Sequence, residues 1–205
     1  MKGLVAVAVL AVVPFAIACA DADVAPASAS PSAGPSALMS APPTPTRSGE
    51  AHEPIGLLPD DCEPGPQPVL VSDHVAAGIG GDPVWAIGFG GAAATLSFSP
   101  DDPYRDHGWL RKVLWLLDRS ASDPVTVTGV RVADGLQLWF QYRQGGSQEP
   151  VLLLDPAAPD GEHGDWYEYR GYFVAPTAGC YRLRAAWPGG GWELPFRAGL
   201  DETLH

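Results

Sequence analysis

The 205-residue sequence contains no asparagine and two lysines, and it has no cluster of basic residues anywhere along its length. Acidic residues outnumber basic ones by 24 to 12, which gives a formal net charge of −12 at pH 7. Nucleic acids and anionic lipid surfaces are bound through concentrated positive charge. The composition therefore argues against a nucleic-acid partner and against a polybasic grip on a membrane.

The sequence also lacks an apolar run long enough for a comfortable transmembrane helix. The run from Leu4 to Ala18 has about fifteen residues and is interrupted by Pro14, whereas a membrane span needs about twenty. Lys2 precedes this run and small residues follow it, a pattern typical of a secretory signal. The sequence therefore predicts export. A permanent transmembrane helix and a cleaved signal that leaves Cys19 free are the alternatives.

The end of the apolar run reads Ala16-Ile17-Ala18-Cys19, which resembles the lipobox of bacterial membrane lipoproteins. The resemblance covers residues 1–19 and implies that the signal peptide, residues 1–18, is removed and that Cys19 is diacylated. Two acyl chains hold a protein stably at a bilayer, at about 0.8 kcal/mol per buried methylene. The resemblance therefore implies a protein whose membrane partner is reached through lipid on Cys19, at the extracytoplasmic face of the cell membrane.

Three cysteines are present, so giving the lipid to Cys19 leaves Cys62 and Cys180. In an exported protein this even remainder favours a disulfide, with two free thiols as the alternative. Cys180 shares its strand parity with Arg182, on the polar side of an alternating strand. We therefore expect a staple that ties an N-terminal segment to a sheet, in place of a bridge buried between two sheets.

Residues 19–54 consist mainly of Ala, Pro, Ser and Thr, as in the Ala-Pro-Pro-Thr-Pro-Thr stretch at 41–46. Such a segment has too little apolar surface to offset the entropy of ordering, so we predict a disordered linker. Residues 55–205, about 150 residues, are then one domain of ordinary size. The linker would act as a spacer between the lipid and this domain.

Short apolar alternations fill the rest of the chain, and no convincing helix interrupts them. Leu138, Phe140 and Tyr142 alternate with polar residues, which indicates a half-buried strand. Val113–Leu117 is apolar at every position, which indicates a strand covered on both faces, with a helix over 110–118 as the alternative. Further strands are expected at 68–72, 84–89, 95–99, 124–132, 151–154, 167–173, 181–185 and 192–197.

Glycine and proline indicate where these strands turn or distort. Residues 76–83 are expected to form a glycine-rich loop, and Asp134-Gly135 predicts a hairpin turn. Val125 and Val127, before Gly129, occupy odd-numbered positions, whereas Val130 and Val132, after it, occupy even-numbered ones. One extra residue at Gly129 would return all four valines to one face of the strand, which predicts a β-bulge there. Pro195 has no amide hydrogen, so its strand is expected to be an edge strand or to end there.

The eight or nine strands expected between residues 84 and 198, after the short strand at 68–72 in the entry segment, predict an all-β fold, an antiparallel immunoglobulin-like β-sandwich. The Pro-Thr-Ala-Gly-Cys-Tyr-Arg-Leu stretch at 176–183 resembles a strand near the C-terminus of uncharacterised secreted bacterial lipoproteins. That resemblance implies a domain without implying an activity.

The patterns that suggest chemistry do not hold up in context. Residues 88–93 match the dinucleotide-binding pattern, but we expect a strand where that site requires a helix. The acidic turn at 101–106 lacks EF-hand spacing, and the histidines lack zinc spacing. We therefore predict no catalytic residues, no metal and no cofactor. A hydrolase that uses carboxylates of the 155–168 loop is a lesser alternative, with Glu162, Asp165 and Glu168 as its acids.

Four of the seven tryptophans are the main indication of a binding surface. They are Trp139, Trp166, Trp187 and Trp192, which lie on a polar parity or beside loops. Exposed indoles can stack on sugar rings or on a protein partner, and indoles that fill the core or its ends are the alternative. The predicted function is a non-enzymatic interaction or envelope-structure module, with a glycan- or cell-wall-binding module as the alternative.

Overall fold

The structure is a computed structural model that describes residues 54–72, 75–91 and 93–201. The predicted signal peptide, Cys19 and the linker up to residue 53 lie outside the described residues. The described part is all β, as predicted, and contains no helix long and apolar enough to cross a membrane.

Fourteen strands make up the described part of the chain. They are β1 (Val69–Ser72), β2 (Val75–Gly81), β3 (Val84–Ile87), β4 (Thr95–Phe98), β5 (Tyr104–Arg105), β6 (Gly108–Asp118), β7 (Val125–Arg131), β8 (Trp139–Tyr142), β9 (Gln148–Glu149), β10 (Leu152–Leu154), β11 (Gly161–His163), β12 (Trp166–Ala175), β13 (Gly179–Trp187) and β14 (Gly190–Leu200). The number exceeds the eight or nine expected mainly because β5, β9 and β11 are pairings of two or three residues that leave little trace in sequence.

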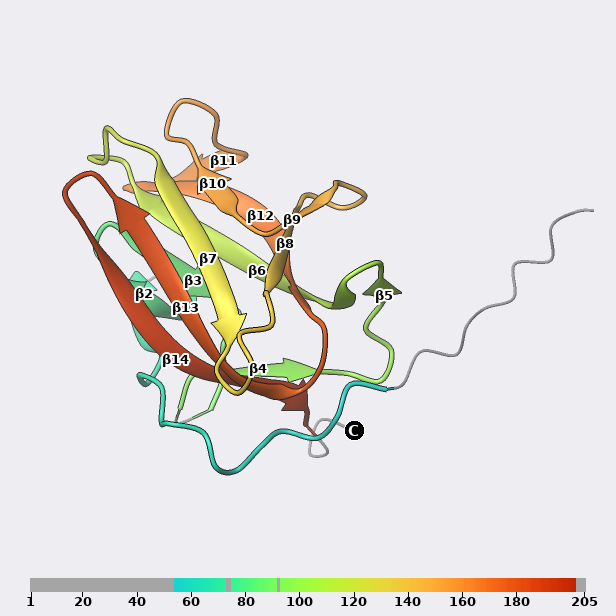
Figure 1. Cartoon of the computed structure of the whole chain (residues 1–205). Helices are drawn as coiled ribbons and strands as arrows, with labels where there is room; N and C mark the ends of the chain where they lie inside the picture. Colours follow the sequence, from blue (N-terminus) through green and yellow to red (C-terminus); the bar gives the residue numbers. More distant parts are fainter. Residues whose placement is uncertain (1–53, 73–74, 92, 202–205) are drawn as a thin grey trace, which may run out of the picture. The chain divides into compact units, whose positions relative to one another are not determined.

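The strands form two sheets that pack face to face (Figure 1). The nine-stranded sheet has the order β1-β2-β3-β6-β12-β8-β9, with β11 paired to β12 and β5 paired to β6. The five-stranded sheet has the order β10-β7-β13-β14-β4. Figure 1 shows β7, β13 and β14 as a layer in front of β3, β6 and β12. This arrangement confirms the predicted immunoglobulin-like β-sandwich.

The clearest alternating strands fold as expected because one face of each is buried in the core. In β13, Tyr181, Leu183 and Ala185 are fully buried, whereas Arg182 and Arg184 are exposed. All of β13 pairs with β14, which closes the predicted C-terminal hairpin.

The pairing of β14 with β4 is parallel, whereas the other pairings between named strands of the described residues are antiparallel. It involves only Arg197–Leu200 of β14, so within the described part of the chain the preceding residues of β14 have one strand neighbour. Pro195 therefore lies where β14 is locally an edge, which is the position that its missing amide hydrogen predicts.

Both faces of β6 are covered over Trp115–Leu117, within the apolar run that predicts this. Trp115 and Leu117 face the core between the sheets, and Leu116 on the opposite face is also fully buried. Leu116 packs in a second, smaller cluster with Ile87, and Trp85 and Trp166 pack against them. The alternative of a helix over 110–118 is therefore wrong.

The expectation of a glycine-rich loop at 76–83 is also wrong, because Val75–Gly81 forms β2 between β1 and β3. A Cβ atom at Gly78 would lie 2.4 Å from the Ile87 side chain, and Gly80 has a φ of 144°. Glycine is thus what allows β2 to pass beside β3. The same glycines remove the side-chain alternation by which a strand is recognised in sequence.

The predicted β-bulge at Gly129 is absent. β7 pairs with β13 in unbroken register over residues 126–131, so Val130 points outward and is 39% exposed. A Cβ atom at Gly129 would lie 2.7 Å from the Leu138 side chain, which is fully buried. This glycine makes room for Leu138 in the core and does not restore an apolar face.

The turn at Asp134-Gly135 is confirmed, and the chain then changes sheets. The Arg131 backbone amide donates to the Leu136 carbonyl at 2.8 Å. The next residue, Gln137, forms an isolated antiparallel β-bridge with Val130 of β7. From Trp139 onward the chain is β8 and pairs with β12 of the other sheet. This crossing carries β8 to the region where the site described below lies.

Candidate functional site

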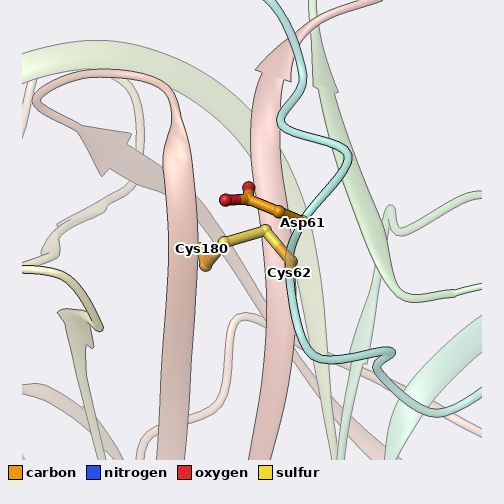
Figure 2. A group of neighbouring side chains, drawn as sticks. All are labelled: Asp61, Cys62 and Cys180. Atoms are coloured by element: carbon orange, nitrogen blue, oxygen red, sulfur yellow. A yellow bond between two sulfur atoms is a disulfide. The ribbon is translucent and has the colours of Figure 1, made fainter.

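The Cys62–Cys180 disulfide joins the segment before β1 to β13, with 5.3 Å between the two Cα atoms (Figure 2). The segment runs beside the end of β14, where the Leu58 amide donates to the Leu200 carbonyl at 3.2 Å. Both cysteines are half-buried. The bridge is therefore the predicted staple between an N-terminal segment and a sheet.

Asp61 lies beside this disulfide and completes a group of three potential metal ligands (Figure 2). The sulfur atoms of Cys62 and Cys180 are bonded to each other. Neither is therefore available as the thiolate that binds a metal ion. In the acidic turn at 101–106, Asp102 pairs with Arg111 at 3.3 Å and accepts a hydrogen bond from the Ser99 amide at 2.8 Å. The disulfide thus accounts for the two cysteines, and the contacts with Arg111 and Ser99 account for Asp102.

Trp139 lies on the outer face of the nine-stranded sheet and is covered by a histidine. Its indole stacks on the His107 imidazole, with 3.7 Å between ring centroids and an interplanar angle of 4°. The turn between β5 and β6 thus occupies one of the two flat faces of the indole. Trp139 is half-buried.

The other three predicted tryptophans pack in different places. Trp166 belongs to the small outer cluster around Leu116, whereas Trp187 and Trp192 pack against the main core from the β13–β14 hairpin. The Trp192 indole donates at 3.2 Å to carbonyls of β2 and of the residue that begins β3. Trp139 pairs with Val174, eight positions from Trp166 along β12, a span of about 26 Å. The four indoles therefore form no common platform.

The three loop acids do not converge either. Glu162 pairs in register with Tyr167, and Glu168 pairs with Gly161, so the two glutamates lie on opposite faces of the β11–β12 hairpin. Glu162 forms an ion pair with Arg119 at 3.1 Å, and Asp165 is exposed in the connecting turn. Most glycoside hydrolases use two carboxyl groups that flank one bond of the substrate, and the two glutamates of this hairpin do not face one another in that way.

The structure instead reveals a hollow of about 510 Å³ on the outer face of the nine-stranded sheet. Its lining includes Lys112 of β6, Arg170 and Tyr172 of β12, Arg143 just after β8, and Asp160 just before β11. Lys112 pairs with Tyr172 in register, so these side chains share a face. The alternate residues of both strands face the core. We call this group the outer-face hollow.

Arg143 has a φ of 62° and is the one non-glycine residue with a positive φ in the described part of the chain. This left-handed conformation costs about 1–2 kcal/mol and persists where surrounding contacts hold it. Here the Arg143 amide donates to the Arg170 carbonyl at 3.0 Å, and the Gln141 side-chain amide donates to the Arg143 carbonyl at 3.1 Å. The backbone at the rim of the hollow is thus fixed from two sides.

Asp160 connects the two arginines. Its carboxylate accepts a hydrogen bond from Arg143 Nε at 2.7 Å and another from the Arg170 amide at 2.7 Å, and its side chain is 7% exposed. Burial alone would raise the pKa of Asp160, but the hydrogen bonds from Arg170, Tyr142 and Arg143 lower it overall. The pKa of Tyr142 is raised, first by burial and then by its hydrogen bond to Asp160. Asp160 is therefore an ionised structural anchor.

Because the native pKa of Asp160 lies below its value in the unfolded chain, ionised Asp160 stabilises the fold above about pH 4. That contribution is lost as the pH falls through the native pKa. We expect Asp160→Asn to lower the free energy of unfolding at pH 7 by about 1–3 kcal/mol.

The difference between wild type and Asp160→Asn should shrink between about pH 5 and pH 2, as measured by urea unfolding at each pH. Asp106→Asn, at an exposed turn residue, is the control and should follow the wild type throughout. A gap that stays constant across this range would contradict the assigned role.

Sequence reasoning missed the outer-face hollow. Asp160 stands in a Pro-Asp-Gly stretch that has ordinary turn composition, and its partner Arg143 is 17 residues away along the chain. The two meet only because β8 and β12 are neighbours in the sheet. Alternation identifies Lys112 and Arg170 as outward-facing only once the pairing of β6 with β12 is known.

No protein-family model and no curated protein matches this sequence. Among solved structures, the chain is similar to the ASH/PapD-like domain of human CEP192 (PapD-like domain 7). The identity is 11% and the TM-score is 0.25, with 65% of this chain and 97% of that chain covered. A likeness at this level carries no argument about partners or activity.

Proposed function

We propose that this chain is an exported lipoprotein, anchored by lipid on Cys19 at the extracytoplasmic face of the cell membrane. Its β-sandwich serves as a non-enzymatic interaction or envelope-structure module. The observation that carries the proposal is the Cys62–Cys180 disulfide. Structural disulfides form in oxidising compartments outside the cytoplasm.

The disulfide also bears on the role of Cys19. With Cys62 and Cys180 joined, Cys19 is the one cysteine left over from the three in the sequence. It follows a signal-like apolar run at the position where bacterial lipoproteins are acylated. The pairing and the lipobox resemblance thus support the same assignment from different parts of the chain.

The separation of the predicted site residues favours an interaction module over the alternatives. Glu162 and Glu168 lie on opposite faces of a hairpin, which argues against the hydrolase alternative. The dispersed, half-buried tryptophans leave the glycan-binding alternative without a shared platform. The net negative charge of the chain also disfavours binding to nucleic acid and is compatible with a place in the cell envelope.

The proposal is tested by expressing wild type and Cys19→Ala in a bacterial host with labelled palmitate. Wild type should carry label and sediment with membranes, because two acyl chains hold a protein durably. Cys19→Ala should carry no label and should not yield a processed membrane-bound form. The matched control Cys62→Ala breaks the disulfide and should keep both the label and the membrane association. Processed, membrane-bound Cys19→Ala protein would contradict the proposal.

A further inference from the structure

Positive charge is scarce in this chain, and part of it gathers in the outer-face hollow. Three of the chain's 12 lysines and arginines line the hollow, in a molecule whose formal net charge is −12. Asp160 is the one acidic residue among the lining residues. The hollow is thus a local reversal of the overall charge.

The three cations differ in what they contact. Arg143 is paired with Asp160, at 2.6 Å between Nη2 and Oδ1. No carboxylate of the described residues pairs with Lys112 or Arg170, and both side chains are exposed. Five arginines in the same part of the chain do have carboxylate partners: Arg111, Arg119, Arg131, Arg143 and Arg182. The hollow therefore holds two positive charges that the protein does not neutralise.

The sheet register places these two charges together. Lys112 lies opposite Tyr172, and Arg170 is two residues before Tyr172 on the same face, so Lys112 and Arg170 are diagonal neighbours on adjacent strands. Like charges so placed on one face repel each other. An anion between them would replace that repulsion with two charge-assisted contacts.

We propose that the outer-face hollow binds a dianionic phosphate group between Lys112 and Arg170. Two unpaired positive charges match the charge of a phosphate monoester, which is close to −2 at neutral pH. A guanidinium fork can donate two parallel hydrogen bonds to phosphate oxygens, and the lysine ammonium acts as a second point of contact. A volume of about 510 Å³ lies within the range of small-molecule sites.

The wall of the hollow is already fixed without a ligand. Asp160 holds the Arg143 side chain and the Arg170 backbone amide, and the Arg143 amide is bonded to the Arg170 carbonyl. The ring of Tyr172 beside Lys112 offers a surface for the group that carries the phosphate. The backbone that carries Arg170 therefore needs no reordering on binding, and the ordering cost falls on the Lys112 and Arg170 side chains.

The test is calorimetric titration of the full chain with inorganic phosphate at about pH 8, where the dianion predominates, at constant ionic strength. Wild type should bind saturably with a Kd below about 1 mM, and acetate should bind at least about tenfold more weakly. The Lys112→Gln/Arg170→Gln double variant should lose at least about tenfold in phosphate affinity. Arg170→Lys, which keeps the charge but lacks the fork, should lie between the two.

The matched control is Arg184→Gln, at an exposed arginine of β13 on the other sheet, which has no carboxylate partner among the described residues. It should bind phosphate as wild type does. Unchanged thermal unfolding of the double variant shows that any loss comes from the site. The proposal is overturned if phosphate does not saturate up to about 10 mM, if acetate binds equally well, or if Arg184→Gln loses as much affinity as the double variant. None of these results depends on lipid at Cys19, so the two proposals can fail separately.

Discussion

Replacing Cys62 and Cys180 together by alanine is expected to lower the free energy of unfolding by about 4–5 kcal/mol. The two cysteines are separated by 118 residues, and the chain-entropy model assigns a loop of this length about that stabilisation. The loss arises mainly in the unfolded state, because a chain without the bridge has more conformations to occupy. The native contacts around the bridge, such as the Leu58–Leu200 hydrogen bond, can persist without it.

The measurement is urea unfolding of the Cys19→Ala chain, which is free of lipid, with and without the disulfide. The m-value should also rise when the bridge is removed, because the unfolded state becomes more expanded and exposes more surface. Wild-type disulfide that is chemically reduced and alkylated should match the double variant. A loss below about 1 kcal/mol with an unchanged m-value would show that the bridge does not constrain the unfolded chain as the model requires.

Phe173→Ala should be the most damaging core substitution, with an expected loss of about 3–5 kcal/mol. Phe173 of β12 is fully buried, and four aromatic rings surround it, with centroid distances between 5.4 and 5.8 Å. These rings belong to Phe89, Trp115, Phe140 and Phe196. Since Phe196 comes from the opposite sheet, the cavity would open between the two layers of the sandwich.

Phe173→Leu separates cavity formation from loss of aromatic contact. It keeps an apolar group of similar volume in the site, so we expect a loss of about 1.5 kcal/mol or less. Leu153→Ala, at a β10 residue that is 54% exposed, is the surface control and should change stability by no more than about 0.5 kcal/mol. Denaturant unfolding of the three variants measures all of these values. Equal effects of Phe173→Ala and Leu153→Ala would contradict the assignment of the core.

Strands with strong side-chain alternation could be predicted because local sequence determines which face is buried. The Tyr181–Leu183–Ala185 series in β13 is an example, and so is the unbroken apolar run in β6. β2 could not be predicted in this way. Its glycines carry no pattern, and they are required because a neighbouring strand passes too close for side chains.

The candidate site was predictable only in its covalent part. Cysteine counting and strand parity are local arguments, and they led to the Cys62–Cys180 staple. The outer-face hollow depends on strands that are distant in sequence, since Lys112 lies on β6, Arg170 lies on β12 and Arg143 follows directly after β8. The parity of Trp139 correctly placed it on an outer face, but the His107 ring that covers it comes from another turn.

The most direct test of the central claim is the mass of the N-terminal peptide of the mature protein extracted from membranes. The account predicts that this peptide begins at Cys19 and carries the added mass of a diacylglyceryl group on its sulfur. The same sample, digested without reduction, should contain the Cys62–Cys180 cross-linked peptide. A mature protein that begins at another residue, or that begins at an unmodified Cys19, would contradict the account.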